Sequence, residues 1–220
     1  MNTYNDLTIN IPAEVYIRLN RASREYDMCI NDIYYYILNG GKLDDKLFST
    51  LFEDAFEKFY AYSSNKDIIS NEYVIPAVRD EYDAADKLIN NYWSINFDGS
   101  YKCTITNITI KPNTEEVIYK ETIDDKWVED IGYLHSKIEI YDQIINKLIT
   151  VIHNGISQSV FDEYQKLRNL SVEASIAEDE NRAKLLEEVV KPIIAEGDPK
   201  DYTWNLNPVE KTLTITRNNA

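Results

Sequence analysis

Residues 131–152 have the sequence IGYLHSKIEIYDQIINKLITVI, in which apolar side chains recur at alternating steps of three and four residues. This spacing indicates an amphipathic helix, because 3.6 residues complete each turn and such positions share one face. The repeat lasts for three heptads, so we predict a buried helical seam. The side chains of this predicted seam are Leu134, Ile138, Tyr141, Ile145, Leu148 and Ile152.

A second long helix is predicted to follow the first. Asn154-Gly155 ends the first helix, and Ser159 begins a pattern that reaches about Ala195, with a charged break at 178–181. Because the connection is short, the two helices should pack as an antiparallel αα-hairpin. The seam should then face four side chains of the second helix, Val160, Tyr164, Leu167 and Leu170.

Alternation of apolar and polar residues predicts strands on both sides of this hairpin. The predicted strands are 93–97, 101–110, 117–122, 202–206 and 212–217. Asp98-Gly99 is a strong hairpin turn and Pro112-Asn113 forms the next turn, so the simplest arrangement of the first three strands is an antiparallel β-meander. The last two strands should form a C-terminal β-hairpin.

Two further helices are predicted before the meander, from 43 to 63 with a polar loop at 63–67, and from about 76 to 92. The fold class is therefore α+β with helix dominant. The predicted segments are an association module at 1–41, a helical segment at 42–92, the β-meander at 93–123, the αα-hairpin at 124–197 and the C-terminal β-hairpin at 198–220.

The first forty residues have their own pattern. Leu7-Thr-Ile-Asn-Ile11 alternates as a half-buried strand, and Pro12 ends it at the start of a helix over about 13–26. Asp27-Met28 is predicted to form a turn, and a second helix should run from about Asn31 to Leu38 before Asn39-Gly40-Gly41.

This order of strand, Pro, helix, turn and helix over residues 6–39 resembles the ribbon-helix-helix family, which includes the Arc, MetJ and CopG-type repressors. The resemblance implies a dimer in which strands from two chains pair. We therefore expect an association strand of Leu7, Thr8, Ile9, Asn10 and Ile11, paired with another chain or else with a strand of the same chain.

In that family the outward strand residues contact bases in the major groove. The corresponding residues here are Thr8 and Asn10, with Asp6 beside them, and nucleic acid would be contacted through residues 6–12. The acidic residues of the module outnumber its three arginines, and a net charge of −15 makes the whole chain repel phosphates. These charges therefore favour association over DNA binding for this module.

Catalytic chemistry is not indicated by the sequence. The two histidines, His135 and His153, lie too far apart along one helix to share a metal, and Cys29 and Cys103 have no metal-ligand spacing. The carboxylate pairs fit solvated or helix-start charges, as at Asp124-Asp125. With no glycine-rich phosphate loop, we predict a protein that is not an enzyme and needs no cofactor or metal.

Three function classes follow. The first is a structural or assembly protein of a virus or phage particle, which forms at least a homodimer, contacts other proteins and uses its 17 tyrosines at half-buried contacts. The second is a ribbon-helix-helix transcriptional regulator, and the third is an acidic inhibitor of a basic host protein. No signal peptide or membrane span is evident, so we expect the protein in the cytoplasm of the producing cell and in a virion.

Overall fold

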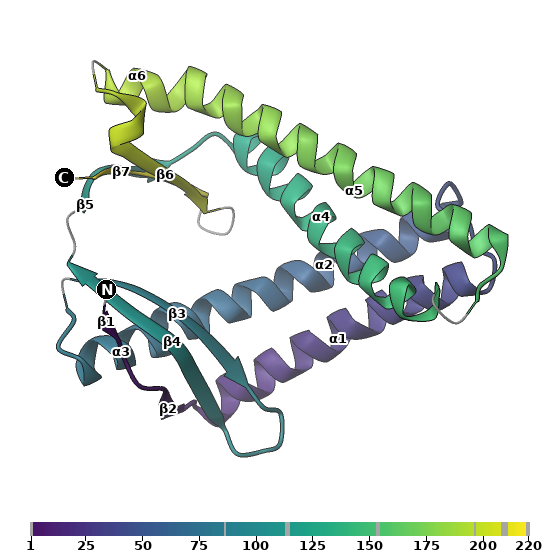
Figure 1. The fold of residues 1–220 in the computed structure, drawn as a ribbon, viewed down its shortest axis with the longest axis horizontal. Helices are drawn as coiled ribbons and strands as arrows, with labels where there is room; N and C mark the ends of the chain where they lie inside the picture. Colours follow the sequence, from purple (N-terminus) through teal and green to yellow (C-terminus); the bar gives the residue numbers. More distant parts are fainter. Residues whose placement is uncertain are drawn as a thin grey trace. The chain divides into compact units, whose positions relative to one another are not determined.

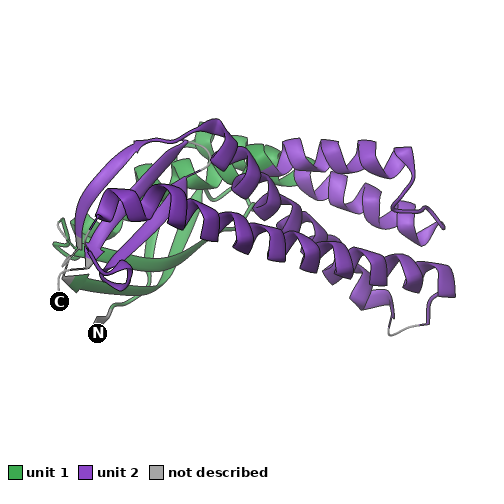
Figure 2. Ribbon diagram, turned by 90° about the horizontal axis from the view of Figure 1, so that it is seen from above, with its two compact units in different colours: residues 1–25, 60–114 green, residues 26–59, 115–220 purple. Residues whose placement is uncertain are grey.

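The computed structural model has an α+β fold in which helix predominates, as the sequence predicts. The residues that it describes are 2–85, 87–112, 115–152, 155–195, 197–207 and 211–218. The chain divides into two compact units, each built from two segments (Figures 1 and 2). Unit 1 comprises residues 1–25 and 60–114, and unit 2 comprises residues 26–59 and 115–220.

The sheet of unit 1 is organised around one long strand, β4. Its other strands are β1 (Asn2–Thr3), β2 (Leu7–Asn10) and β3 (Lys87–Ile95), and β4 covers Lys102–Pro112. All pairing is antiparallel, with β3 along one edge of β4 and β1 and β2 along the other. The predicted strand at 7–11 is confirmed as β2, and it pairs with a strand of its own chain.

One face of β4 is apolar, but the alternation shifts along the strand. Cys103 and Ile105 are buried in its first half, whereas Ile108 and Ile110 are buried in its second half. Asn107 has a φ of +53° between the two halves, and the register with β3 shifts between Asn90 and Tyr92. This irregularity, a β-bulge, turns the apolar side chains of both halves toward the same core.

Helices cover that face of the unit 1 sheet. Residues of α1 (Ala13–Leu38) and α2 (Lys46–Ile69), a π-helical turn (Ser70–Val74) and α3 (Ile75–Glu81) all contribute. The buried core side chains of unit 1 are Ile11, Val15, Tyr16, Leu19, Ile69, Val74, Val78, Ala84, Cys103, Ile105, Ile108 and Ile110.

Tyr16 holds the β3–β4 hairpin to α1. Its hydroxyl donates to the carbonyl of Asn96 at 3.2 Å and accepts from the N–H of Gly99 at 2.9 Å. Its ring packs edge-on against Phe97 and Tyr101. Gly99 has a φ of +84°, which glycine adopts without strain, so the predicted Asp98-Gly99 turn is confirmed.

Unit 2 is dominated by two antiparallel helices that lie side by side, α4 (Asp125–Ile152) and α5 (Gln158–Leu185) (Figure 1). The helix of α5 continues through a π-helical turn (Leu186–Val190) into α6 (Lys191–Ile194), so the predicted charged break at 178–181 is wrong. The predicted αα-hairpin is confirmed.

The buried face of α4 matches the predicted seam only in part. Tyr141, Ile145 and Leu148 are buried, whereas Leu134, Ile138 and Ile152 are half-buried. The centre of the face is formed by Leu148 of the seam together with Ile140 and Ile144, and all three are fully buried. On α5, Val160, Tyr164 and Leu167 are buried and Leu170 is half-buried.

A second sheet belongs to unit 2, with β7 (Thr212–Asn218) between β5 (Glu115–Thr122) and β6 (Tyr202–Asn207). A short 3-10 helix (Pro199–Asp201) precedes β6. The predicted C-terminal hairpin is confirmed, but the predicted meander over 93–123 is wrong, because its third strand pairs with β7 and not with β4. The apolar face of β7, with Leu213 and Ile215, packs against Val190 and Ile194.

Three helix boundaries also differ from the prediction. α1 is continuous, so the predicted turn at Asp27-Met28 is wrong, and the two-helix arrangement that the resemblance implies is replaced by one helix. No Gly or Pro interrupts residues 13–38, and Cys29, Ile30 and Ile33 continue the buried face begun by Tyr26.

The predicted loop at 63–67 is likewise wrong, since α2 continues to Ile69. The helix predicted over 76–92 ends at Glu81, and residues 87–92 belong to β3 instead. Asp83, with a φ of +47°, lies between the two elements and ends the helical geometry.

Candidate association surfaces

The predicted association strand lies at an edge of the unit 1 sheet. Leu7 and Ile9 are half-buried against the core, and Ile11 is fully within it. Thr8 and Asn10 are exposed, and so is Asp6. The apolar face of β2 is therefore covered within its own chain, and β2 offers only a polar face and its outer backbone edge to a partner.

A pocket of about 490 Å³ lies in unit 1, where the π-helical turn approaches α1. Widened turns of this kind often occur at functional sites. The lining side chains are Glu14, Val15, Arg18, Ile68, Glu72 and Tyr73. The charged groups on its wall, Glu14, Arg18 and Glu72, are exposed to solvent, so the pocket is a wet, open depression without a desolvated group to select a ligand.

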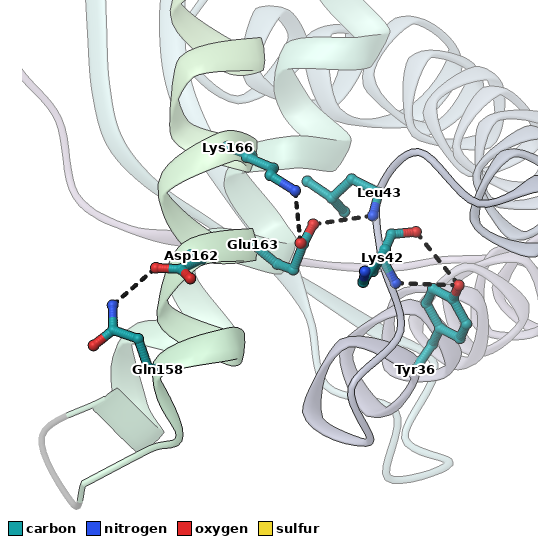
Figure 3. Close-up of polar contacts among 7 residues, drawn as sticks. All are labelled: Tyr36, Lys42, Leu43, Gln158, Asp162, Glu163 and Lys166. Carbon is teal, nitrogen blue, oxygen red and sulfur yellow. Dashed lines mark hydrogen bonds and ion pairs between the residues drawn. The ribbon is translucent and has the colours of Figure 1, made fainter.

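Glu163 is a buried carboxylate on α5 that the sequence did not single out (Figure 3). It accepts the backbone N–H of Leu43 at 3.0 Å and pairs with Lys166 at 2.8 Å. The hydrogen bond to Glu163 raises the pKa of Lys166. In the same loop, the Tyr36 hydroxyl accepts the N–H of Lys42, and a side chain at Gly41 would collide with the Tyr36 ring. The hydrogen bond from Leu43 to Glu163 anchors the 39–45 loop to α5, and the Tyr36 contacts hold the same loop against α1.

Glu178 is a second buried carboxylate on α5. Its Oε1 lies 2.6 Å from Nη2 of Arg182, and its Oε2 lies 3.7 Å from Nδ1 of His135 on α4. The Arg182 guanidinium also lies 5.9 Å from the centre of the Trp204 ring on β6. The predicted charged break at 178–181 is therefore a polar contact that joins three elements of unit 2.

His153 lies outside the described residues. Asp124 accepts the N–H of Lys126 at 2.9 Å, which confirms its predicted place at the start of α4.

Both cysteines are buried thiols. Burial and a hydrogen bond to Asp54, at 3.0 Å, raise the pKa of Cys29 to about 12. Burial raises the pKa of Cys103 to about 11. A thiol that stays protonated is a poor nucleophile, so both groups serve as core side chains at neutral pH.

Large apolar side chains reach solvent on several elements. Ile17 and Met28 on α1, Tyr92 on β3 and Val117 on the edge strand β5 are exposed. On α5, Val172 and Ile176 are one turn apart and remain 57% and 55% exposed. Contiguous exposed apolar surface marks interaction sites, whereas a single exposed apolar side chain is ordinary, so the adjacent pair on α5 is the more informative feature.

Comparisons with protein-family models, with curated proteins and with solved structures found no match for this chain. Across the described ranges, no helix is both long enough and apolar enough to cross a bilayer. Within the same part of the chain, no three His, Cys, Asp or Glu side chains are grouped so that they could hold a metal ion.

Proposed function

We propose that this protein is a non-enzymatic structural or assembly protein, a virus or phage particle component that associates with copies of itself and with other proteins. The observation that carries the proposal is the set of exposed apolar side chains on a chain of net charge −15, of which Val172 and Ile176 on α5 are the clearest. Fully burying a Val or Ile side chain contributes about 1.5–3 kcal/mol, and a contact that covers the exposed part of these two side chains gains a corresponding share, which favours association.

The strand edges add a second kind of contact. The outer edge of β2 carries backbone donors and acceptors that another strand can pair with. The edge strand β5 differs, because Glu116, Lys120 and Glu121 are exposed along it and its register with β7 shifts between Val117 and Tyr119. Charges and bulges of this kind discourage edge pairing, so β2 is the better candidate.

The test is the mass of the purified full chain by light scattering across a concentration series. We expect a mass of at least two chains that falls on dilution. A single-chain mass at every concentration would contradict the proposal. The same samples should be measured in high salt, because contacts built on apolar side chains persist when surface charges are screened.

A gel shift with duplex DNA at low salt separates this proposal from the regulator. The assembly protein should leave DNA unshifted, because its charge of −15 repels phosphates. Salt-sensitive binding that is lost when exposed Thr8 and Asn10 are both changed to Ala, with the oligomer intact, would establish the ribbon-helix-helix regulator instead.

A further inference from the structure

The outward face of α5 carries a row of four exposed residues at steps of four: Arg168, Val172, Ile176 and Glu180. The buried face of α5 is formed by Leu167, Ser171 and Ala174 among others. At about 100° per residue, Val172, Ile176 and Glu180 lie on the opposite side of the helix, and Arg168 lies at the border of that side. Residues at steps of four form the ridge by which helices most often pack against one another.

The order of side chains along this row is self-complementary. One end is cationic, the middle is apolar and the other end is anionic. A two-fold axis through the midpoint between Val172 and Ile176 brings each of these residues opposite the other in the second copy, and it brings Arg168 opposite Glu180 of that copy. Isologous contacts have this property, in which residue i meets residue j and j meets i.

We propose that the row from Arg168 to Glu180 is a homodimer contact, in which two α5 helices cross antiparallel and the partner is a second copy of this chain. The inference rests on the proposed assembly function and names its first contact. Val172 and Ile176 supply the apolar centre, and the two symmetric Arg168–Glu180 pairs set the direction and the register.

Arg168 and Glu180 of one chain form ion pairs with the second copy and not with each other. They are 12 residues apart in one helix, about 18 Å along its axis, which is too far for an ion pair within the chain. The Arg168 guanidinium lies 6.0 Å from the centre of the Tyr164 ring, which holds it on the helix surface. A single row is a small contact, so the dimer should be reversible and its population should follow concentration.

Charge reversal tests the pairing. In Arg168→Glu, both symmetric pairs become repulsive, and Glu180→Arg has the same effect with the opposite sign. Each variant should raise the dimer dissociation constant on the order of a hundredfold, measured by analytical ultracentrifugation. The double variant Arg168→Glu/Glu180→Arg should restore dimerisation, because each pair is again complementary. An equimolar mixture of the two single variants should also dimerise, because a row with two acidic ends in one chain then lies opposite a row with two basic ends in the other.

Apolar and control variants complete the experiment. Val172→Asn/Ile176→Asn should abolish the dimer. At a protein concentration below the native dimer dissociation constant its circular dichroism melting should match that of the native chain, because both side chains are exposed in the single chain. Lys126→Glu and Glu129→Arg make the same charge changes at exposed positions of α4 and should leave the dimer intact.

The outcomes separate this inference from the proposed function. If the native chain associates and none of the row variants weakens it, the α5 contact is overturned and the assembly proposal stands. If the native chain is a monomer throughout, both are overturned. If the single reversals disrupt the dimer but neither the double variant nor the mixture restores it, the Arg168–Glu180 pairing is overturned.

Discussion

At the scale of single residues, the polar atoms that matter most are those that tie a loop to a helix. The Tyr16 hydroxyl binds the β3–β4 hairpin to α1, and the Glu163 carboxylate binds the 39–45 loop to α5. Both accept a backbone N–H in a part-buried hydrogen bond, and removing the acceptor loses the contribution of that bond to stability.

Tyr16→Phe should therefore lower the free energy of unfolding by about 1–2 kcal/mol, because the N–H of Gly99 loses its acceptor while the ring remains. Urea denaturation followed by circular dichroism measures the change. Tyr92→Phe is the matched control, since that side chain is 72% exposed, and its curve should overlay the native one. Equal losses in the two variants would contradict the role given to the Tyr16 hydroxyl.

Glu163→Ala should cost about 1–3 kcal/mol of unfolding free energy, because the N–H of Leu43 is then left without its acceptor. Glu163→Gln should cost less, since its amide oxygen can still accept that bond and only the ion pair to Lys166 is lost. The readout is the urea midpoint, with Glu173→Ala at an exposed position of the same helix as the control. An equal loss for Gln and Ala would show that the charge matters more than the hydrogen bond, because both variants remove the charge and only Ala removes the acceptor.

At the scale of elements, side chains of one helix, α4, differ widely in how deeply they are buried. Leu148 is fully buried, whereas Ile138, ten residues earlier and also in the predicted seam, is half-buried. Replacing a packed core side chain costs both its transfer energy and the cavity left behind, and a half-buried site loses less of each.

Leu148→Ala should lower the unfolding free energy by about 2–5 kcal/mol, and Ile145→Ala, at a site 9% exposed, should fall in the same range. Ile138→Ala is the comparison and should cost clearly less than either. Thermal and urea unfolding of the three variants would check the order. A loss at Ile138 equal to that at Leu148 would restore the regular heptad seam as the true buried face.

The helices and tight turns that depend on short-range sequence patterns could be predicted. The spacing of apolar residues in 131–152 located α4, and Asp98-Gly99 located a hairpin. The turn expected at Asp27-Met28 is absent because burial along α1 continues past it, which the resemblance to a shorter motif obscured. The partner of β5 could not be predicted, because pairing with β7 joins segments about a hundred residues apart and no local signal reports it.

The side chains proposed for association could not be identified from the sequence either. Val172 and Ile176 are apolar residues of the predicted second helix, and only the burial of Leu167, Ser171 and Ala174 shows that they face outward. The sequence did not single out Glu163 and placed Glu178 in a charged break of the helix, whereas both carboxylates are buried and make contacts.

At the scale of the whole molecule, the net charge of −15 is the dominant feature. Self-repulsion of like charges destabilises the compact state, and added salt screens it over a length of about 10 Å at 0.1 M. The urea midpoint should therefore rise when sodium chloride is added to a low-salt buffer. A midpoint that falls would show that the attractive pairs, such as Glu178 with Arg182, outweigh the repulsion.

The two buried thiols have a practical consequence, since Cys103 lies in unit 1 and Cys29 in unit 2. Each thiol becomes reactive only when the structure around it opens, so its rate of alkylation reports the transient opening of one unit. In Cys29→Ala and Cys103→Ala, the remaining thiol should react many-fold more slowly in native buffer than in urea. A destabilising change beside one thiol, such as Ile105→Ala, should raise the alkylation rate of Cys103. If the alkylation rate of Cys29 rises as well, the two units open together, and if it is unchanged, they open separately.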